Sequence, residues 1–253
     1  MSDLKGKAVL VSGASTGIGA GAARAFGAAG ARVAVHYNSS KGEAEQVAAD
    51  IRSAGGEAIT VGGDVTKHDN VRRIVGDTLA AFGRIDVLVN NAGGLVKRTP
   101  IADYTDEFVD RVLTLNVRQV IWFMTEVVPV MRRQGGGNIV NVSSIAARHG
   151  GGPGSIIYAG SKGFIATATR GWAKELVKDK IRVNAVSPGV IMTPFHERFS
   201  TPEQLKAMQA MIPMDRLGTP EECAGTFLYL ASDALSGYVT GQNIEVNGGQ
   251  YMP

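Results

Sequence analysis

The sequence predicts an α/β fold in which a parallel sheet is covered by helices on both faces. Short runs rich in β-branched residues alternate along the chain with longer amphipathic segments, which is the order of a strand–helix repeat. The short runs are apolar throughout, so both faces of each strand are expected to be buried. The 253 residues contain no linker or shift in composition, and we therefore expect a single domain over residues 1–253.

Seven runs are predicted to be strands, and the helices lie between them. The predicted strands are Ala8–Ser12, Arg32–Tyr37, Ala58–Val61, Val87–Asn90, Asn138–Val142, Ile181–Val186 and Ile244–Val246. The predicted helices cover about residues 17–29, 41–54, 67–82, 105–133, 156–178, 202–211 and 220–231. Residues 188–220 depart from this rhythm, since prolines and methionines interrupt them. An irregular segment of that length is more often a functional lid than a connector, so we expect a flap over a site at the carboxyl edge of the sheet.

Composition and charge exclude several classes of function. Hydrophobic residues make up 44% of the chain and charged residues 19%, as in ordinary globular proteins. The net charge is +3 without a cluster of Lys and Arg, so no nucleic-acid partner is indicated. The single cysteine, Cys223, leaves no internal disulfide and fits a reducing compartment. Without a signal-peptide core or an apolar run that could span a bilayer, a cytoplasmic enzyme with no membrane partner is expected. Four scattered histidines and Cys223 lack ligand spacing, so no metal site is predicted.

A glycine-rich turn follows the first predicted strand and opens a helix. Glycines there allow a tight turn, let backbone N–H groups approach a pyrophosphate and place it at a helix N-terminus. The spacing is Gly-x-x-x-Gly-x-Gly, which matches the generic dinucleotide fingerprint Gly-x-Gly-x-x-Gly only in part. A purely structural turn is the alternative. The candidate cofactor-binding residues of this turn are Gly13, Ser15, Thr16, Gly17, Ile18 and Gly19.

The end of the second predicted strand bears on the choice between NADP(H) and NAD(H). A site that prefers NAD usually offers Asp or Glu to the ribose hydroxyls, but residues 36–41 contain no acid. Tyr37, Asn38 and Ser39 are the candidate contacts, and polar groups of this kind can donate to a 2′-phosphate that a carboxylate would repel. The sequence therefore slightly favours NADP(H) over NAD(H), with a higher kcat/KM expected for the phosphorylated cofactor.

The next two strand ends carry further candidate cofactor contacts. Asp64, followed by Val65, could accept a hydrogen bond from an adenine amino group, or it could cap the helix that begins nearby. Asn91, Ala92 and Gly93 close the following strand, and small residues there would let a flat adenosine lie against the backbone. The alternative for this second stretch is an ordinary Asn/Gly turn.

The segment Tyr158-Ala159-Gly160-Ser161-Lys162 carries the strongest indication of catalysis. Residues four apart share one face of a helix, so the Lys162 ammonium would lie near the Tyr158 phenol. A neighbouring positive charge favours the phenolate and lowers the pKa of a tyrosine from about 10. Tyr158 could then act as a general acid/base at an alcohol or ketone oxygen. The alternative is a surface tyrosine with a lysine one turn later.

Taken in order, these segments resemble the short-chain dehydrogenase/reductase family, from about residue 5 to residue 249. The resemblance implies a Rossmann-like sheet of seven parallel strands, NAD(P)-linked oxidoreduction of an alcohol or carbonyl, and often a homotetramer. The motifs that carry it, besides those already named, are Asn116, residues 141–144, Pro188-Gly189, residues 239–242 and residues 246–249. A dinucleotide sensor that has lost catalysis is the alternative from another class, and the intact Asn/Ser/Tyr/Lys set argues against it.

The resemblance also implies a role for individual residues. Tyr158 is the acid/base, Lys162 lowers its pKa and contacts the nicotinamide ribose, and Ser144 hydrogen-bonds the substrate oxygen. Asn116 holds a proton-relay water near Lys162, and Thr193 binds the nicotinamide carboxamide. Further cofactor contacts are expected at Pro188, Gly189, Val190 and Ile191. From the residues alone, Ser143 or Ser144 could instead bond its own backbone, and Asn116 could solvate a helix kink.

Two departures from the family pattern affect specificity. Thr16 stands where NADP-preferring members often have Arg, which weakens the NADP(H) prediction, and residues 145–157 are one residue longer than usual. Three segments expected near the mouth of the site each carry basic residues. Lys97 and Arg98 follow residues 90–93, Arg148 and His149 follow Ser144, and His196 and Arg198 lie on the flap. Arg148 and His149 are candidate substrate contacts. These cations could attract an anionic substrate or form a solvated rim. A sugar or polyol substrate is expected, with a 3-oxoacyl thioester as the alternative.

Overall fold

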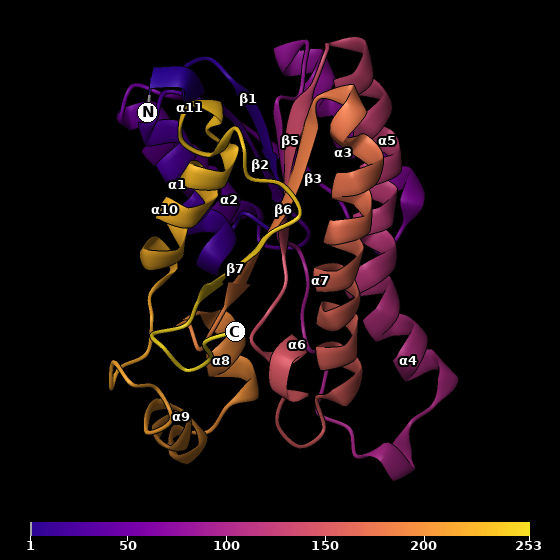
Figure 1. Ribbon diagram of the computed structural model, residues 1–253, viewed down its shortest axis with the longest axis vertical. Helices are drawn as coiled ribbons and strands as arrows, with labels where there is room; N and C mark the ends of the chain where they lie inside the picture. Colours follow the sequence, from indigo (N-terminus) through magenta and orange to yellow (C-terminus); the bar gives the residue numbers. More distant parts are fainter. Residues whose placement is uncertain (1) are drawn as a thin grey trace.

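The computed structural model describes residues 2–253 as one seven-stranded parallel sheet with helices on both faces (Figure 1). The strand order is β3-β2-β1-β4-β5-β6-β7, so the chain reverses direction across the sheet between β1 and β4, as in a doubly wound fold. The strands are β1 (Ala8–Val11), β2 (Arg32–Tyr37), β3 (Glu57–Gly62), β4 (Val87–Asn90), β5 (Gly137–Val142), β6 (Ile181–Pro188) and β7 (Asn243–Val246). The predicted fold class is confirmed.

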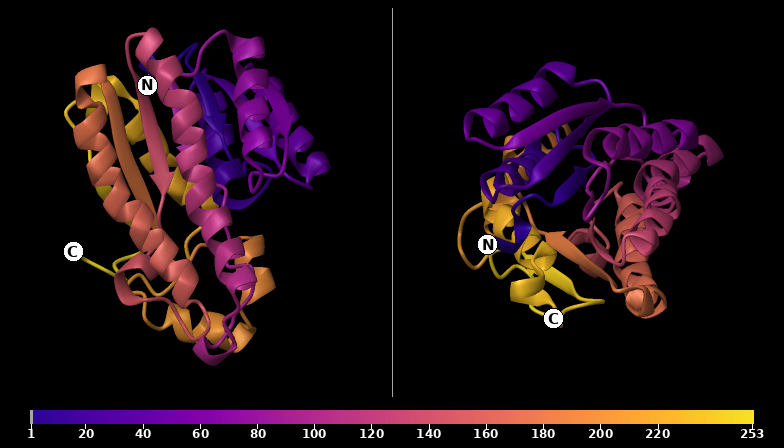
Figure 2. Two further views of the ribbon diagram at one scale, coloured as in Figure 1. Left: turned by 90° about the vertical axis from the view of Figure 1, so that its right-hand side faces the viewer. Right: turned by 90° about the horizontal axis from the view of Figure 1, so that it is seen from above.

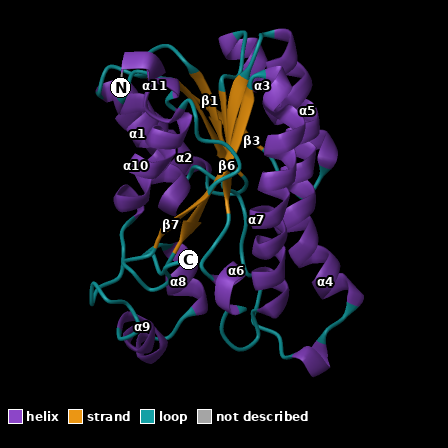
Figure 3. Cartoon of the chain, in the orientation of Figure 1, coloured by secondary structure: helices purple, strands orange, loops and turns teal. Residues whose placement is uncertain are grey.

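The helices form two layers, one on each side of the sheet (Figure 3). One layer contains α1 (Gly17–Ala28), α2 (Lys41–Ser53) and α10 (Pro220–Ala231), and the other contains α3 (His68–Phe82), α5 (Gln119–Arg133) and α7 (Ile156–Leu176). The shorter helices are α4 (Asp106–Leu113), α6 (Ala146–His149), α8 (Pro194–Phe199), α9 (Pro202–Gln209) and α11 (Asp233–Ser236). No helix of residues 2–253 is both long and apolar enough to cross a bilayer.

The apolar strand sequences are buried on both faces, as their composition predicts. In β1, Val9 and Val11 pack toward α1 and α10, whereas Ala8 and Leu10 pack toward α3 and α5, because successive side chains point to opposite faces. All four are fully buried, and each buried valine or leucine side chain stabilises the fold by roughly 1.5–3 kcal/mol. Cys223 of α10 is also fully buried in this core.

The predicted helix 105–133 is wrong in one respect, because the structure interrupts it. Residues Thr114–Arg118 form a π-helical turn between α4 and α5. The amide of Asn116 lies within this turn and donates to the Val112 carbonyl at 2.9 Å and to the Gly94 carbonyl at 2.9 Å. A π turn inserts one extra residue and redirects a side chain, and such turns occur often at functional sites.

The segment 188–220 contains α9, which matches the predicted helix 202–211, and α8, which was not predicted. Pro194 and Pro202 occupy the first turns of these helices, where a proline costs no hydrogen bond. The Thr201 hydroxyl accepts from the Gln204 N–H and the Gln204 side chain accepts in return, which forms a capping box at α9. Figures 1 and 2 show α8 and α9 at the carboxyl edge of the sheet, beside the end of β7.

Candidate active site

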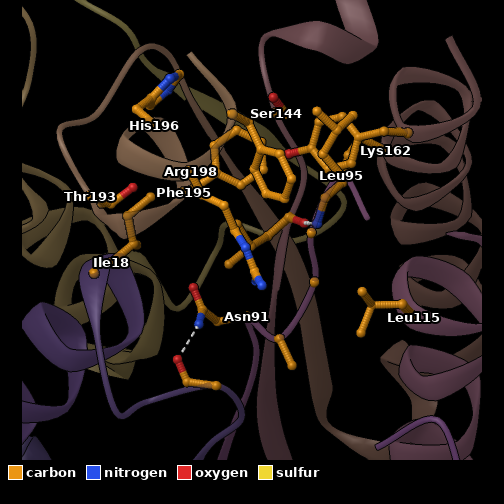
Figure 4. Close-up of a pocket in the computed structure, with 18 of the residues that line it drawn as sticks. Ile18, Asn91, Leu95, Leu115, Ser144, Lys162, Thr193, Phe195, His196 and Arg198 are labelled. Carbon is orange, nitrogen blue, oxygen red and sulfur yellow. Dashed lines mark hydrogen bonds between the residues drawn. The ribbon is translucent and has the colours of Figure 1, made fainter. Parts of the chain in front are cut away.

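A cleft of about 1730 Å³ opens at the carboxyl edge of the sheet, between the strand ends and α8 (Figure 4). It collects residues from the ends of β1 to β6, as expected for an open α/β sheet. The predicted residues that line it are Gly13, Ser15, Thr16, Gly17, Ile18, Asn38, Ser39, Asp64, Val65, Asn91, Ala92, Gly93, Ser144, His149, Tyr158, Lys162, Pro188, Gly189, Val190, Ile191 and Thr193. The glycine-rich turn and the Tyr158 segment, 140 residues apart, thus share one cleft.

The glycines of the turn are required by its geometry. Gly13 and Gly17 have φ values of +63° and +57°, which only glycine adopts without strain. A Cβ at Gly13 would lie 2.9 Å from Ala92 Cα, and one at Gly19 would lie 2.3 Å from the Gly13 carbonyl. Gly19 itself does not line the cleft but lets α1 approach the turn. The open backbone at the start of α1 fits a pyrophosphate, because free N–H groups and the helix dipole favour an anion there.

His36, which was not predicted as a site residue, holds the backbone of the glycine-rich turn in place. Its Nδ1 accepts a hydrogen bond from the Gly13 N–H at 2.9 Å, and its Nε2 lies 2.9 Å from the Gly63 carbonyl. The ring is buried, and this burial lowers the pKa of His36. The neutral ring therefore carries its hydrogen on Nε2, which donates to Gly63. The signal in the sequence was a single polar ring inside the apolar run 33–37.

Asn91 ties the end of β4 to the same turn. Its amide donates to the Ser12 carbonyl at 2.9 Å and to the Gly13 carbonyl at 2.9 Å, and Figure 4 draws one bond from this amide. The Ser12 hydroxyl accepts from the N–H groups of Asn91 and Ala92, both at 3.0 Å. The turn after β1 and the turn after β4 therefore form one rigid wall of the cleft.

Asp64 lines the cleft and also bonds its own chain. One carboxylate oxygen accepts from the Thr66 N–H at 2.9 Å and from the Thr66 hydroxyl at 2.7 Å, which is an Asx turn. Burial acts to raise the pKa of Asp64, but the two bonds from Thr66 and the charges of Lys67 and Arg111 together lower it. The carboxylate is therefore ionised at neutral pH, with one oxygen left for a donor in the cleft.

Ser144, Tyr158 and Lys162 come together in the cleft, and Figure 4 shows Ser144 and Lys162 in the same part of it. The Lys162 ammonium lies 5.9 Å from the centre of the Tyr158 ring and donates to the Val142 carbonyl at 2.8 Å. The Ser143 hydroxyl is buried and donates to the Lys162 carbonyl at 2.9 Å. Both serines line the cleft, but it is the Ser144 hydroxyl that lies beside the Tyr158 phenol.

Asn116 lies behind these residues rather than on the cleft surface. Its Oδ1 accepts from the Gly94 N–H at 3.0 Å, so the π turn holds the loop that follows β4. A Cβ at Gly93 would lie 2.8 Å from the Asn116 Oδ1 and 3.2 Å from the Lys162 ammonium nitrogen. Asn116 and Lys162 therefore approach a common point, and only glycine fits between them and the cleft.

The pKa of Tyr158 differs from the expectation. Burial raises the pKa of its phenol, and the neighbouring Ser144 hydroxyl acts in the opposite direction without outweighing burial. Burial also lowers the pKa of Lys162 to about 8, because a charged group loses solvation in the interior. The net direction for Tyr158 is opposite to the one expected from the Tyr/Lys spacing.

Besides Gly19 and Asn116, two further predicted contacts, Tyr37 and Arg148, lie outside the cleft. The Tyr37 ring turns toward Gly62, where a Cβ would lie 2.7 Å from the ring, and packs against the core between α1 and α2. Arg148 forms an ion pair with Glu245 at 2.8 Å, and its guanidinium lies 5.5 Å from the centre of the Tyr251 ring. This arrangement does not support the predicted contact of Arg148 with substrate, since a partner 97 residues away holds its charge.

The remaining predicted cations divide between the cleft and its surroundings. Arg98, His149, His196 and Arg198 line the cleft, whereas the Lys97 ammonium lies 5.8 Å from the centre of the Phe108 ring, away from it. The sequence analysis missed the apolar part of this end of the cleft, which consists of Leu95, Phe195, Phe199, Met208 and Met211. It also missed Gln250 near the C-terminus and, beside Ser39, Glu43 in the first turn of α2.

Among residues 2–253, no group of three or more His, Cys, Asp or Glu side chains is placed to hold a metal ion. The chemistry-bearing groups of the cleft are instead the phenol, the ammonium and the hydroxyls. A doubly wound parallel sheet with a glycine-rich turn and a Tyr/Lys/Ser set at its carboxyl edge is the architecture of an NAD(P)-dependent oxidoreductase.

Comparison with known proteins gives the family. A family model described as enoyl-(acyl carrier protein) reductase matches residues 13–250. The 3-oxoacyl-[acyl-carrier-protein] reductase of a Synechocystis species is 39% identical over 252 residues, with 100% of both chains covered. The L-rhamnose 1-dehydrogenase (NAD(P)(+)) of a Sphingomonas species is 38% identical, with 98% of both chains covered. The crystal structure of NADH-dependent reductase A1-R′, responsible for alginate metabolism, matches with a TM-score of 0.92 and 37% identity over 100% of both chains. The chain belongs to the short-chain dehydrogenase/reductase family.

Proposed function

We propose that this oxidoreductase interconverts a secondary alcohol and a ketone, with Tyr158 as the general acid/base. The observation that carries the proposal is the meeting of Tyr158, Ser144 and Lys162 in the cleft that the glycine-rich turn also lines. The nicotinamide ring, when bound, supplies or accepts the hydride. Every other step belongs to the side chains of this cleft.

In the oxidation direction, Ser144 holds the substrate hydroxyl and Tyr158 takes its proton as the hydride leaves the carbon. In reduction, Tyr158 donates the proton to the carbonyl oxygen. The Lys162 ammonium favours the phenolate, which is needed because burial alone disfavours that form. Asn116 and Lys162 approach one point beside Gly93, which supports the proposal that they hold the water that relays the proton.

We assign the dinucleotide to the wall built by the turns after β1 to β4 and by the start of the 188–220 segment. The glycine-rich turn holds the pyrophosphate, Asp64 and residues 91–93 hold the adenosine, and residues 188–191 with Thr193 hold the nicotinamide. Tyr37 is omitted from this set because its ring packs away from the cleft.

A preference for NADP(H) over NAD(H) rests on the polar groups at the end of β2. Asn38, Ser39 and Ser40 line the cleft and offer donors to a 2′-phosphate, while Glu43 lines the same region and opposes one. We expect a higher kcat/KM for NADPH than for NADH in the wild type, and a further rise in that ratio for Glu43→Gln. Equal or reversed ratios in the wild type would overturn the preference.

The substrate is proposed to be a sugar, a polyol or a related hydroxy compound. The relatives named for L-rhamnose and for alginate metabolism support this class, as does the glycine-rich part of the cleft wall, where His149 and Ser155 are the polar side chains. A 3-oxoacyl thioester is the second candidate. The acyl-carrier-protein reductase from Synechocystis favours it, and so does the apolar surface of Phe195, Met208 and Met211.

The test is a screen that follows nicotinamide absorbance with both cofactors, using a panel of aldoses, ketoses, polyols and a 3-oxoacyl thioester. Turnover of a sugar at a kcat/KM above that of the thioester is expected. Tyr158→Phe should lose ~10²–10⁴-fold in kcat on the same substrate while it still binds NADPH. A protein that binds NADPH but turns over no member of the panel, or a Tyr158→Phe variant with near-wild-type kcat, would contradict the proposal.

The same proposal includes a single domain in the cytoplasm, assembled as a homotetramer. The segment 188–220 acts as the flap of the site, since α8 supplies Phe195, His196 and Arg198 to the cleft. Exposed apolar side chains on α7, such as Phe164 at 44% exposure, support burial of that helix face between subunits.

A further inference from the structure

Cationic side chains from two separate loops reach the end of the cleft where Tyr158 lies. Arg98 follows β4, whereas His196 and Arg198 belong to α8, and all three line the cleft. Arg98 is held in place because its Nε donates to the Phe199 carbonyl at 3.1 Å and its Nη1 donates to the Pro153 carbonyl at 3.0 Å. Two carbonyls fix the direction of this guanidinium without neutralising it.

Arg198 is not neutralised within the described chain either. Among residues 2–253, no carboxylate forms an ion pair with it. Its guanidinium lies 5.8 Å from the centre of the Phe199 ring, and Figure 4 shows the side chain next to Phe195 in the cleft. Glu197 of α8 also lines the cleft, so the local balance is two guanidiniums against one carboxylate.

The pKa of His196 indicates a positive electrostatic potential beside these guanidiniums. Burial lowers the pKa of His196, and the charge of Arg98 lowers it further. Charges in a partly enclosed cleft are screened less than charges on an open surface. Such a site lowers its free energy when an oxyanion supplies the missing charge and accepts the guanidinium hydrogens in pairs.

Phe195 connects the reacting groups to Phe199, which contacts both guanidiniums. Its ring centre is 5.9 Å from that of Tyr158 and 5.1 Å from that of Phe199. A substrate with its carbonyl at Tyr158 would pass Phe195 before it reaches the guanidiniums. The oxyanion would therefore be several bonds from the reacting carbon, and not adjacent to it.

We infer that the substrate is an anionic sugar derivative whose carboxylate or phosphate, distant from the reacting carbon, is bound by Arg198 together with Arg98. This inference rests on the proposed function and deepens it by giving the charge of the substrate. Arg198 acts on binding rather than on the proton transfer, so its contribution should be found in KM.

The experiment compares three ketones matched in length: a keto-sugar acid, a ketose phosphate and a neutral ketose. Steady-state rates are measured for the wild type, Arg198→Gln, Arg198→Lys and the control Arg133→Gln. Arg133 is exposed at the end of α5, at the opposite edge of the sheet, and its replacement makes the same change in net charge. The difference between acid and phosphate decides which oxyanion the site takes.

The wild type should show a lower KM for one of the anionic ketones than for the neutral one. Arg198→Gln should raise that KM by ~10–100-fold with kcat within about threefold, and should leave the neutral ketone unaffected. Arg198→Lys should retain part of the affinity, and Arg133→Gln should behave as the wild type. Added salt should raise the KM of the anionic ketone only.

Three results overturn the inference, and they distinguish its failure from that of the proposed function. If the wild type turns over neutral and anionic ketones with equal KM, or if Arg198→Gln changes both equally, the anion site is wrong and the proposed function stands. If the wild type turns over no ketone or alcohol of any charge, the proposed function fails and the inference fails with it.

Discussion

Lys162 illustrates how a single buried charge is both a cost to the fold and a requirement of the proposed chemistry. Its ammonium is buried at the base of the cleft with one hydrogen bond, to the Val142 carbonyl. Burial of a charged group disfavours the charged form, and the pKa of about 8 records that cost. The same positive charge, together with the Ser144 hydroxyl, favours the phenolate form of Tyr158. Residues under such opposing demands are typical of active sites.

The stability contributed by Lys162 should therefore depend on pH in a defined direction. A lysine in the unfolded chain titrates near ~10.4, so between pH 8 and that value the unfolded state binds more protons than the folded state. The free energy of unfolding of the wild type should rise with pH over this range relative to Lys162→Met, by roughly 3 kcal/mol at most. Urea unfolding of both proteins at several pH values measures the difference, and parallel profiles would contradict it.

His36 is a second residue whose effect should be found in one parameter. His36→Ala leaves the Gly13 N–H without its acceptor, and a buried donor without a partner costs ~1–3 kcal/mol. The dissociation constant for NADPH, followed by fluorescence, should rise by ~10–100-fold. Turnover at saturating cofactor should stay within about threefold. His68→Ala, which removes a partly exposed imidazole on α3, is the control, and an unchanged dissociation constant in His36→Ala would exclude the positioning role.

At the scale of elements, the strands could be predicted because local pattern and tertiary environment agree. Every strand except the edge strand β7 supplies apolar side chains to the cores on both faces of the sheet. The π turn at Thr114–Arg118 could not be predicted, because the bonds that stabilise it reach from Asn116 to Gly94 in another loop. Helix α8 was missed for a related reason, since six residues give too little periodicity to detect.

The ion pair between Arg148 of α6 and Glu245 of β7 could not be predicted from the sequence either. Arg148 and Glu245 side chains are 19% and 9% exposed, and removal of one partner leaves a buried charge unpaired. Arg148→Met should lower the free energy of unfolding by about 3–5 kcal/mol, whereas the double variant with Glu245→Gln should recover much of the loss. Denaturant titration measures both, and kcat/KM of the folded variants should equal that of the wild type. A rise in KM without loss of stability would restore Arg148 as a substrate contact.

At the scale of the whole molecule, the position of the site in the fold could be predicted from the sequence. Which side chains line the site could be predicted only in part. The predicted cofactor and catalytic residues follow strand ends, and parallel strands bring those ends to one edge. The orientation of Tyr37 and Arg148 depended on partners that no local pattern marks, namely the core beside Gly62 and Glu245. Motif order thus gives the location of a site, whereas packing decides which neighbours of the motif enter it.

The proposed homotetramer can be tested directly by measuring the number of subunits in solution. Light scattering on the purified protein should give four chains per particle, because exposed Phe164 and its neighbours on α7 would be covered in an assembly. Phe164→Glu should shift the particle toward dimers or single chains without changing the far-ultraviolet circular dichroism. A single-chain wild type would refute the tetramer.

The burial of Cys223 has a practical consequence. It is the single cysteine of the chain, and burial raises the pKa of its thiol to about 12, so a maleimide finds no reactive thiolate in the folded protein. A cysteine introduced at an exposed position of α9 would be the one attachment point for a fluorophore. Its signal would report directly whether the segment 194–209 closes when NADPH or a ketone is added.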